Sequence, residues 1–223
     1  MKTGMSNEEE SCLAQRLAMV ETQLRQRGIR KPEILSAFEE VPRHLFTPLD
    51  RRDEAYSDYP VPIGSGQTIS QPYVVALMIQ ELDLRSEHKV LDVGAGSGYQ
   101  TAILARLCRQ VCAVERIVEL TERAVNTLAA INVANVMLST LDGSLGWPEE
   151  APFDRIICGA AAPEVPQAWI DQLADGGRIV LPVGGTEVQS LRVVEKNAGR
   201  VTHRDFCDVR FVPLIGKQGW PGH

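Results

Sequence analysis

The stretch that decides the fold is Val90-Leu91-Asp92-Val93-Gly94-Ala95-Gly96-Ser97-Gly98, an apolar strand that runs directly into a glycine-rich turn. Glycines in such a turn let the backbone approach a ligand, and they accept φ values that other residues avoid. In an open parallel sheet, ligands bind at the carboxyl ends of the strands, where the first strand turns into its helix. The stretch therefore predicts a ligand-binding turn in which Gly94, Gly96 and Gly98 lie beside the ligand.

Helical and strand-like segments alternate around this turn. We predict strands over 89–93, 111–114, 135–139, 153–158 and 177–183, and helices over 99–109, 118–131 and 166–173. Such alternation is typical of parallel βαβ units, so the predicted fold class is α/β, with a doubly wound, mostly parallel, Rossmann-like sheet. After Gly185, strands over 190–195 and 201–214 joined by a turn at 197–199 predict a C-terminal antiparallel edge hairpin.

The part of the chain before the turn predicts an N-terminal helical extension. Apolar residues recur at helical spacing over 13–24, and further helices are expected from Pro32 to Pro42 and from Pro72 onward. Between them, residues 56–72 form a long segment without a regular pattern. Loops of this length are usually functional or disordered, and its proline, aromatic and β-branched residues speak against disorder. We therefore predict a functional loop here.

We predict a single domain over residues 1–223, a length that suits one α/β domain. Residues 1–12 are expected to be flexible, and residues 13–72 to form the N-terminal helices and an active-site loop. Residues 73–184 should form the ligand-binding βα core and residues 185–215 the edge hairpin. The tail over 216–223 is expected to be loose.

Composition excludes several classes of protein. The formal net charge of −6 disfavours a nucleic-acid partner, while 44% hydrophobic and 23% charged residues are typical of a globular chain. No apolar run approaches the ~18 residues of a membrane helix, and residues 1–10 are polar and acidic, unlike a signal peptide. We expect a cytoplasmic protein without a membrane partner, working as a monomer.

Cysteines and histidines do not predict a metal site. The five cysteines are odd in number and lack CxxC spacing, so a disulfide framework or zinc knuckle is not expected. The four histidines include no pair at the i, i+4 spacing that would place two imidazoles on one helical face. We expect free thiols and no metal.

The spacing of the glycines distinguishes between cofactors. A dinucleotide fingerprint requires G-x-G-x-x-G, but Tyr99 stands where the third glycine is needed, and no Gly-Lys-Ser/Thr of a P-loop follows. The run over 90–98 instead resembles the first motif of S-adenosylmethionine-dependent methyltransferases. This resemblance implies S-adenosyl-L-methionine as cofactor and S-adenosyl-L-homocysteine as product.

Three acidic residues stand where a nucleoside would need them. Glu115 closes the second strand, where a carboxylate can accept hydrogen bonds from both ribose hydroxyls; the alternative is a solvated charge. Asp142, followed by Gly143, closes the third strand and could accept from the adenine amine, or simply form a turn. Asp92 could bond the loop backbone or attract the cationic sulfonium, or only stabilise the loop.

Further motifs resemble the protein-L-isoaspartate O-methyltransferase family. They are Gly64-Ser65-Gly66-Gln67-Thr68-Ile69-Ser70-Gln71-Pro72, the glycine turn, residues 111–116, Ala151-Pro152-Phe153-Asp154, and Val209-Arg210-Phe211-Val212-Pro213-Leu214. The resemblance runs from about Leu13 to Leu214 in order. It implies a carboxyl O-methyltransferase that acts on L-isoaspartyl residues of damaged proteins and peptides. One departure is Leu141, where the family has a glycine.

The resemblance also implies roles for particular residues. Ser70 matches the family's active-site serine, and Gln67, Thr68 and Ile69 match its cofactor-side segment. Val212 and Pro213 match the edge that binds the substrate. The residue pattern leaves a second interpretation of Ser70 open, as the N-cap of the helix that begins at Gln71-Pro72.

The acceptor must be argued from residues outside the common core. Amino-group methylases usually carry an Asn/Asp-Pro-Pro-Tyr clamp after the fourth strand, but this chain has Gly159-Ala160-Ala161-Ala162-Pro163 there. Methylation of nitrogen is therefore disfavoured. A carboxyl methyltransferase for a small molecule and a non-catalytic binder of damaged proteins remain as alternatives, and an NAD-dependent oxidoreductase is a weaker third.

Overall fold

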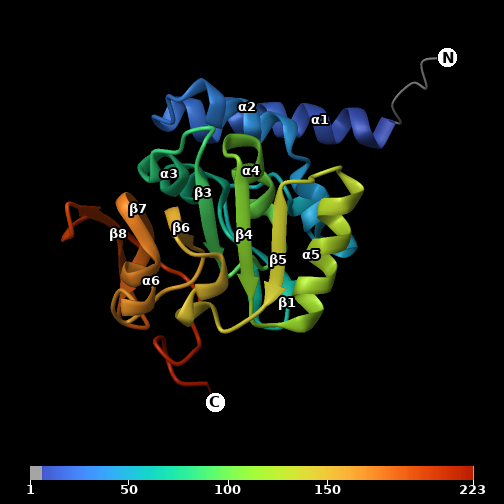
Figure 1. The fold of residues 1–223 in the computed structure, drawn as a ribbon. Coiled ribbons are helices and arrows are strands. Elements are labelled where there is room, and N and C mark those ends of the chain that lie inside the picture. Colours follow the sequence, from blue (N-terminus) through green and yellow to red (C-terminus); the bar gives the residue numbers. More distant parts are fainter. Residues whose placement is uncertain (1–6, 223) are drawn as a thin grey trace.

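A seven-stranded sheet runs through the centre of the molecule in the order β5-β4-β3-β6-β7-β8-β9 (Figure 1). The structure is a computed structural model that describes residues 7–222. The strands of this sheet are β3 (Lys89–Val93), β4 (Gln110–Glu115), β5 (Val136–Thr140), β6 (Phe153–Cys158), β7 (Leu173–Gly184), β8 (Gln189–Asn197) and β9 (Arg200–Val209). The first five in the spatial order are parallel, and β8 and β9 continue the sheet antiparallel. The predicted fold class is therefore confirmed.

Helices cover both faces of this sheet (Figure 1). They are α1 (Asn7–Met19), α2 (Pro32–Glu40), α3 (Pro72–Leu82), α4 (Tyr99–Leu107), α5 (Val118–Ala130) and α6 (Gln167–Gln172). Short helical turns complete the chain at Val20–Leu24, Arg25–Arg27, Arg43–Phe46 (η3), Leu49–Glu54 (η4), Gly143–Leu145 (η5) and Pro148–Glu150 (η6). The predicted helices and strands of the core match these bounds to within a few residues.

Alternate residues of each central strand face two separate apolar clusters. In β3, Val90 packs with the cluster formed by α1 to α5, whereas Leu91 and Val93 pack with the cluster that includes Trp169 of α6. Because a slip of one residue would exchange these faces, the register of the strands is strongly specified. The carboxyl ends of the strands are thereby held as a rigid platform for a site.

The segment predicted as a long irregular loop contains a small hairpin instead. Strands β1 (Val61–Gly64) and β2 (Gln67–Ile69) pair antiparallel. Their turn is Ser65-Gly66, and both residues have positive φ, of 52° and 70°. Such a turn matches the twist of a hairpin, but strands of three and four residues are too short for alternation to reveal. The prediction of an irregular loop was therefore wrong for residues 61–69.

The edge hairpin is confirmed, with one difference at its end. Both Ala198 and Gly199 have positive φ, as a type I′ turn requires. The second strand ends at Val209 instead of residue 214, because the chain then leaves the sheet and pairs with Ala161. The Ala161 N–H donates to the Val212 carbonyl, and the Leu214 N–H donates to the Ala161 carbonyl, each at 2.8 Å.

Residues 7–12 and 216–222 are more ordered than the sequence suggests. Residues 7–12, expected to be flexible, belong to α1, while residues 1–6 lie outside the described residues. Residues 216–222 of the tail, expected to be loose, pack beside the end of β5, and residue 223 lies outside the described residues. The Lys217 N–H donates to Asp142 Oδ2 at 2.9 Å, and the Trp220 N–H donates to the Leu214 carbonyl at 2.7 Å. Hydrogen bonds of the backbone N–H groups explain this order, and hydropathy patterns do not reveal such bonds.

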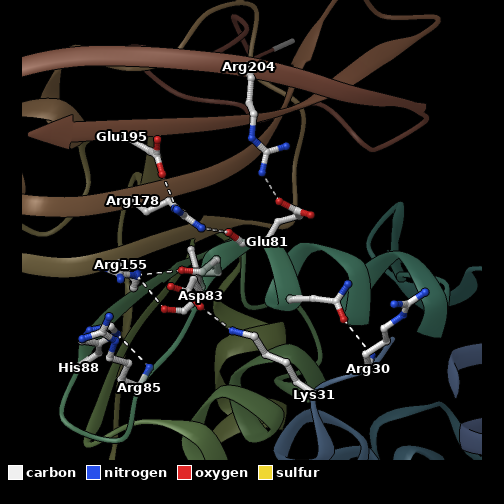
Figure 2. A network of polar contacts seen from close by, with 12 residues as sticks. Arg30, Lys31, Glu81, Asp83, Arg85, His88, Arg155, Arg178, Glu195 and Arg204 are labelled. Carbon is white, nitrogen blue, oxygen red and sulfur yellow. Dashed lines mark hydrogen bonds and ion pairs between the residues drawn. The ribbon is translucent and has the colours of Figure 1, made fainter. Parts of the chain in front are cut away.

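A polar network joins the C-terminal end of α3 to the sheet (Figure 2). Arg155 Nε donates to the Leu82 carbonyl at 2.8 Å, and Arg178 donates to the Glu81 carbonyl at 2.8 Å. Lys31 pairs with Asp83 at 2.5 Å. Because Arg155 stands near the start of β6, this network lies toward the end of the strand opposite to the glycine turn.

Candidate active site

The glycine turn lies at the point where the order of the sheet reverses. From β3 the chain continues outward to β4 and β5 on one side, and later to β6 and β7 on the other. Gly94, Gly96 and Gly98 all have positive φ, of 76°, 55° and 86°. Side chains other than glycine are strained in this conformation, so the turn itself requires these residues. Ligands of doubly wound sheets bind at this kind of switch point.

Glu115 joins the glycine turn to the end of β4. Its side chain is 6% exposed, and Oε2 accepts from the Gly96 N–H at 3.0 Å. The other oxygen, Oε1, accepts from the N–H groups of Arg116 at 2.8 Å and Ile117 at 3.0 Å. A carboxylate offers about four lone-pair positions, so capacity to accept from a ribose hydroxyl remains. The ribose role of Glu115 stays a prediction that this geometry permits.

Asp92 is buried beneath the turn, with 0% of its surface exposed. Its Oδ1 accepts from Gln100 Nε2 at 2.7 Å, and its Oδ2 accepts from the Thr101 hydroxyl at 2.6 Å. Burial raises the pKa of this carboxyl to about 6, although both hydrogen bonds act in the opposite direction. Asp92 thus bonds side chains of α4, and not the loop backbone that the sequence suggested.

Asp142 holds the tail of the chain. Its Oδ1 accepts from the Ser144 hydroxyl at 2.6 Å and the Ser144 N–H at 3.0 Å, and its Oδ2 accepts from the Lys217 N–H. Burial alone would raise the pKa of Asp142, but these hydrogen bonds outweigh it and hold the pKa below its usual value. Three acceptor positions are therefore in use, and the adenine contact stays a prediction.

Gly143 lines the space beside Gly94 and Glu115 that is expected to hold the cofactor. A Cβ there would come 2.6 Å from Val93 Cγ1, so no larger residue fits without a shift of the strand. The neighbouring Leu141, the departure from the family pattern, does not have a positive φ, and its N–H donates to the Glu115 carbonyl at 3.0 Å. The backbone at this position therefore does not demand a glycine.

Three adjoining cavities follow the carboxyl ends of the strands. The first, of about 70 Å³, is lined by Gln67, Val93, Gly94, Val114, Glu115, Arg116, Gly143, Ala160, Pro213, Leu214 and Ile215. The second, of about 40 Å³, is lined by Thr68, Ile69, Ser70, Val75, Gly94, Ala95, Gly96, Ser97, Tyr99, Gln100 and Gly159. The third is an open groove of about 500 Å³, lined by Pro60, Thr68, Ser70, Gln71, Val74, Gly159 and residues 208–212. We call the first two the turn cavities and the third the acceptor groove.

Shared residues connect these spaces. Gly94 lines both turn cavities, and Thr68, Ser70 and Gly159 line both the second turn cavity and the acceptor groove. Most of the residues predicted for the site therefore lie on one continuous surface. Asp92, Gly98 and Asp142 lie outside it, in contact with the elements that shape it.

The hydroxyl of Ser70 is available to a ligand. It forms no hydrogen bond within residues 7–222, and the N-cap of α3 is Gln71, whose side chain does not cap the helix. The interpretation of Ser70 as the N-cap was therefore wrong. Its carbonyl, in contrast, is fixed, because it accepts from Arg43 Nη2 at 2.9 Å.

Sequence reasoning missed several residues that line the site, among them Gly159, Leu214 and Ile215. Gly159 directly follows β6 and lines two of the spaces, and its position at the carboxyl end of a central parallel strand was a usable signal. Leu214 and Ile215 close the first turn cavity from the C-terminal segment. That contact depends on where the chain goes after β9, and no local pattern reports it.

Potential metal ligands and cysteines are scattered over the described chain. Residues 7–222 contain no cluster of three histidine, cysteine or acidic side chains that could hold a metal ion. All five cysteines are free, and burial raises the pKa of the Cys112 thiol to about 11. Over the same residues, no helix has the length and apolar character needed to cross a bilayer.

Fold and site together define a class, the S-adenosylmethionine-dependent methyltransferases with a Rossmann-like sheet. The family model of protein-L-isoaspartate(D-aspartate) O-methyltransferase matches residues 14–219. The chain belongs to this family.

Relatives of known name support the assignment over nine tenths or more of the chain. A protein-L-isoaspartate O-methyltransferase 1 of Syntrophobacter fumaroxidans is 50% identical over 204 residues, covering 92% of this chain and 95% of the relative. A Methanoculleus marisnigri protein-L-isoaspartate O-methyltransferase is 48% identical over 215 residues, with 96% and 98% covered. A Plasmodium falciparum structure, described as a protein-L-isoaspartate O-methyltransferase in complex with S-adenosyl-L-homocysteine, superposes with a TM-score of 0.80 at 27% identity. That match covers 90% of this chain and 98% of the Plasmodium chain.

Proposed function

We propose that this chain transfers a methyl group from S-adenosyl-L-methionine to the carboxylate of L-isoaspartyl residues in damaged proteins and peptides. The observation that carries the proposal is the junction at Thr68, Ser70 and Gly159, which line both a turn cavity and the acceptor groove. A methyl transfer needs donor and acceptor to meet at one point, with the reacting atoms about 3 to 3.5 Å apart. The junction provides one such meeting point.

The residues present fit an adenosyl ligand on the donor side. Three glycines with positive φ leave backbone exposed at the turn, and the Glu115 carboxylate is held against it by the Gly96 N–H. We expect Gly94, Gly96, Gly143 and Glu115 to hold the nucleoside, with Gln67, Thr68 and Ile69 closing over it. When bound, the cofactor supplies a sulfonium-activated methyl group and leaves as S-adenosyl-L-homocysteine.

On the acceptor side, positioning should supply most of the catalysis. A carboxylate with an ordinary pKa near ~4 is already ionised at neutral pH, so no strong general base is needed. Ser70 would donate its free hydroxyl to one oxygen of the acceptor and orient the other toward the methyl group. Alignment of this kind can contribute on the order of 7 to 11 kcal/mol to a reaction.

The product ester explains why methylation serves repair. The backbone nitrogen next to the isoaspartyl ester attacks the ester carbonyl and expels methanol, which closes a succinimide ring. Water then opens the ring, partly to normal aspartate. The chain need perform only the methylation, and the later steps follow from the chemistry of the ester.

Replacing Ser70 with alanine should lower kcat on an isoaspartyl peptide by about 10- to 30-fold, because one hydrogen bond to a charged group is lost. Affinity for S-adenosyl-L-homocysteine should stay within about twofold, since Gly94, Gly96, Gly143 and Glu115 are expected to hold the nucleoside and the Ser70 hydroxyl is expected to bond the acceptor. The assay is transfer of base-labile methyl label to peptides that differ only in L-isoaspartate or L-aspartate. Ser36→Ala, on the exposed face of α2, is the control. A wild-type kcat in S70A would refute the role, and label on neither peptide would refute the proposed activity.

The acceptor groove suits an extended peptide. The Val212 carbonyl is held by the Ala161 N–H, while the Val212 N–H has no partner within the described part of the chain. A free N–H along an extended edge can pair with the main chain of a bound peptide, which would tolerate many flanking sequences. We propose that Val212 and Pro213 line this edge and that the openness of the groove favours peptides over a small molecule.

Replacing Val212 with proline should raise the peptide KM by about 10-fold, because the free N–H that would pair with the peptide is removed. The Kd of S-adenosyl-L-homocysteine should change less than the peptide KM. Val212→Ala keeps the N–H and is the matched control. Equal effects of the two substitutions on KM would show that the peptide does not pair with this N–H.

We further propose that the chain works as a monomer in the cytoplasm on proteins and peptides and not on nucleic acid. The net charge of −6 and the free cysteines support this proposal. Sedimentation of the purified protein tests the first part, and methyl transfer to RNA or DNA tests the last.

A further inference from the structure

Arg43 is the largest charged side chain that the fold buries completely. It begins η3 and is 0% exposed. Its Nε donates to the Ala55 carbonyl at 2.6 Å, and its Nη2 donates to the Ser70 carbonyl at 2.9 Å. One guanidinium thus connects η3 to the end of η4 and to the segment that carries Ser70. The two acceptor residues, Ala55 and Ser70, are 12 and 27 residues from Arg43 in sequence.

The charge of Arg43 has no counterion among residues 7–222. Its two hydrogen-bond acceptors are neutral carbonyls, and no ion pair includes it. The ring of Tyr99 lies beside it, with its centroid 4.8 Å from the guanidinium carbon. Burial lowers the pKa of Arg43 to about 10, which leaves it protonated at neutral pH. A buried positive charge is therefore in contact with the carbonyl of Ser70.

A buried charge without a partner is costly, so a fold that retains one usually has a use for it. Ser70, whose carbonyl accepts from Arg43, also lines the acceptor groove, where the proposed substrate brings a carboxylate. An unneutralised cation close to that point favours an anion there, and the low dielectric of the interior weakens the screening between them. The fixed carbonyl also limits rotation of the Ser70 peptide unit, and with it the direction of the Ser70 hydroxyl.

We propose that Arg43 is a positioning residue for the methyl transfer. Its fork fixes the carbonyl of Ser70 so that the Ser70 hydroxyl faces the acceptor groove, and its charge favours the anionic acceptor. This inference rests on the proposed function. The two parts separate experimentally, because lysine keeps the charge but not the planar fork, whereas methionine keeps neither.

Arg155 provides a matched control for a purely structural role. It is also buried, at 8% exposure, and it also donates to main-chain carbonyls, those of Asp83 (Figure 2), Leu82 and Asp154. It lies near the start of β6 and lines none of the three spaces of the site. Loss of Arg155 should destabilise the fold without touching the acceptor.

The experiment compares Arg43→Met, Arg43→Lys and Arg155→Met in the full chain. For each variant, the free energy of unfolding in urea, the Kd of S-adenosyl-L-homocysteine, and kcat and KM on an isoaspartyl peptide are measured at a temperature where the protein is folded. We expect R43M to lower kcat/KM about 30-fold and to leave the Kd within threefold. R43K should recover most of KM but not kcat. R155M should lose stability and keep kcat/KM within threefold of wild type.

Wild-type kcat and KM in folded R43M would overturn the inference. An equal loss of kcat/KM in R155M would also overturn it. If R43M does not fold, R43K decides alone, and an unchanged kcat in R43K overturns the positioning part. A wild-type chain that methylates no isoaspartyl peptide instead refutes the proposed function, and the inference falls with it.

Discussion

Replacing Glu115 with alanine should weaken the binding of S-adenosyl-L-homocysteine by about 100- to 1,000-fold. Two effects add. The ribose would lose a charged acceptor, and hydrogen bonds to charged groups contribute about 1.5 to 3 kcal/mol each. The glycine turn would also lose its fixed position, because Glu115 accepts from the N–H groups of Gly96, Arg116 and Ile117. Calorimetric titration of the purified variant measures the change.

The same substitution should lower the free energy of unfolding, because three N–H groups near the turn lose their acceptor. An unsatisfied buried donor costs about 1 to 3 kcal/mol, and water reaching the turn would reduce the sum. Glu119→Ala, on the exposed first turn of α5, is the matched control and should change neither quantity. An affinity within threefold of wild type would show that Glu115 only stabilises the turn and does not bind the ribose.

Replacing Asp92 with asparagine should raise the free energy of unfolding at pH 7 by about 2 to 3 kcal/mol. Burial raises the pKa of Asp92 from 3.8 to about 6. The folded state therefore binds this proton more tightly than the unfolded state, and the stability of the wild type falls as the pH rises from about 4 to 6. Asparagine carries no charge to bury, and it can still accept from Gln100 and donate to the Thr101 hydroxyl.

Urea unfolding of both proteins between pH 4 and pH 8 checks this expectation. The gain in stability should be full above about pH 6 and should vanish toward pH 4. Asp171→Asn, on the exposed face of α6, is the matched control substitution. A variant with the same pH dependence as the wild type would show that Asp92 titrates normally.

A functional cost would accompany this gain if the charge of Asp92 attracts the sulfonium. S-adenosyl-L-methionine carries that positive charge and S-adenosyl-L-homocysteine does not. D92N should then weaken binding of the first more than binding of the second. Equal changes in both dissociation constants would assign Asp92 to support of α4 alone.

Local sequence patterns were sufficient to predict the core of the fold. The run over 89–93 forms β3 as expected, and Glu115 ends β4 beside the glycine turn, because strand order and connection follow general rules of parallel sheets. The glycines were identifiable for the same reason, since their positive φ values are a local requirement of the turn.

Features that depend on long-range contacts were not predictable. The tail packs against Asp142 and Ser144 through the backbone N–H groups of Lys217 and Gln218, and backbone groups leave no signature in side-chain patterns. Arg43 contacts the Ser70 carbonyl across 27 residues, and an isolated arginine after a proline gives no sign of burial. The β1–β2 hairpin is too short for alternation to reveal it.

The C-terminal segment closes the first turn cavity with Leu214 and Ile215 and lines the acceptor groove with Val212. Because a protein is synthesised from its N-terminus, the strands β3 to β7 leave the ribosome before these residues do. Val212, Leu214 and Ile215 must therefore be made before either half of the site is complete. A chain that stops before residue 212 should not transfer methyl groups, even where β3 to β7 are present.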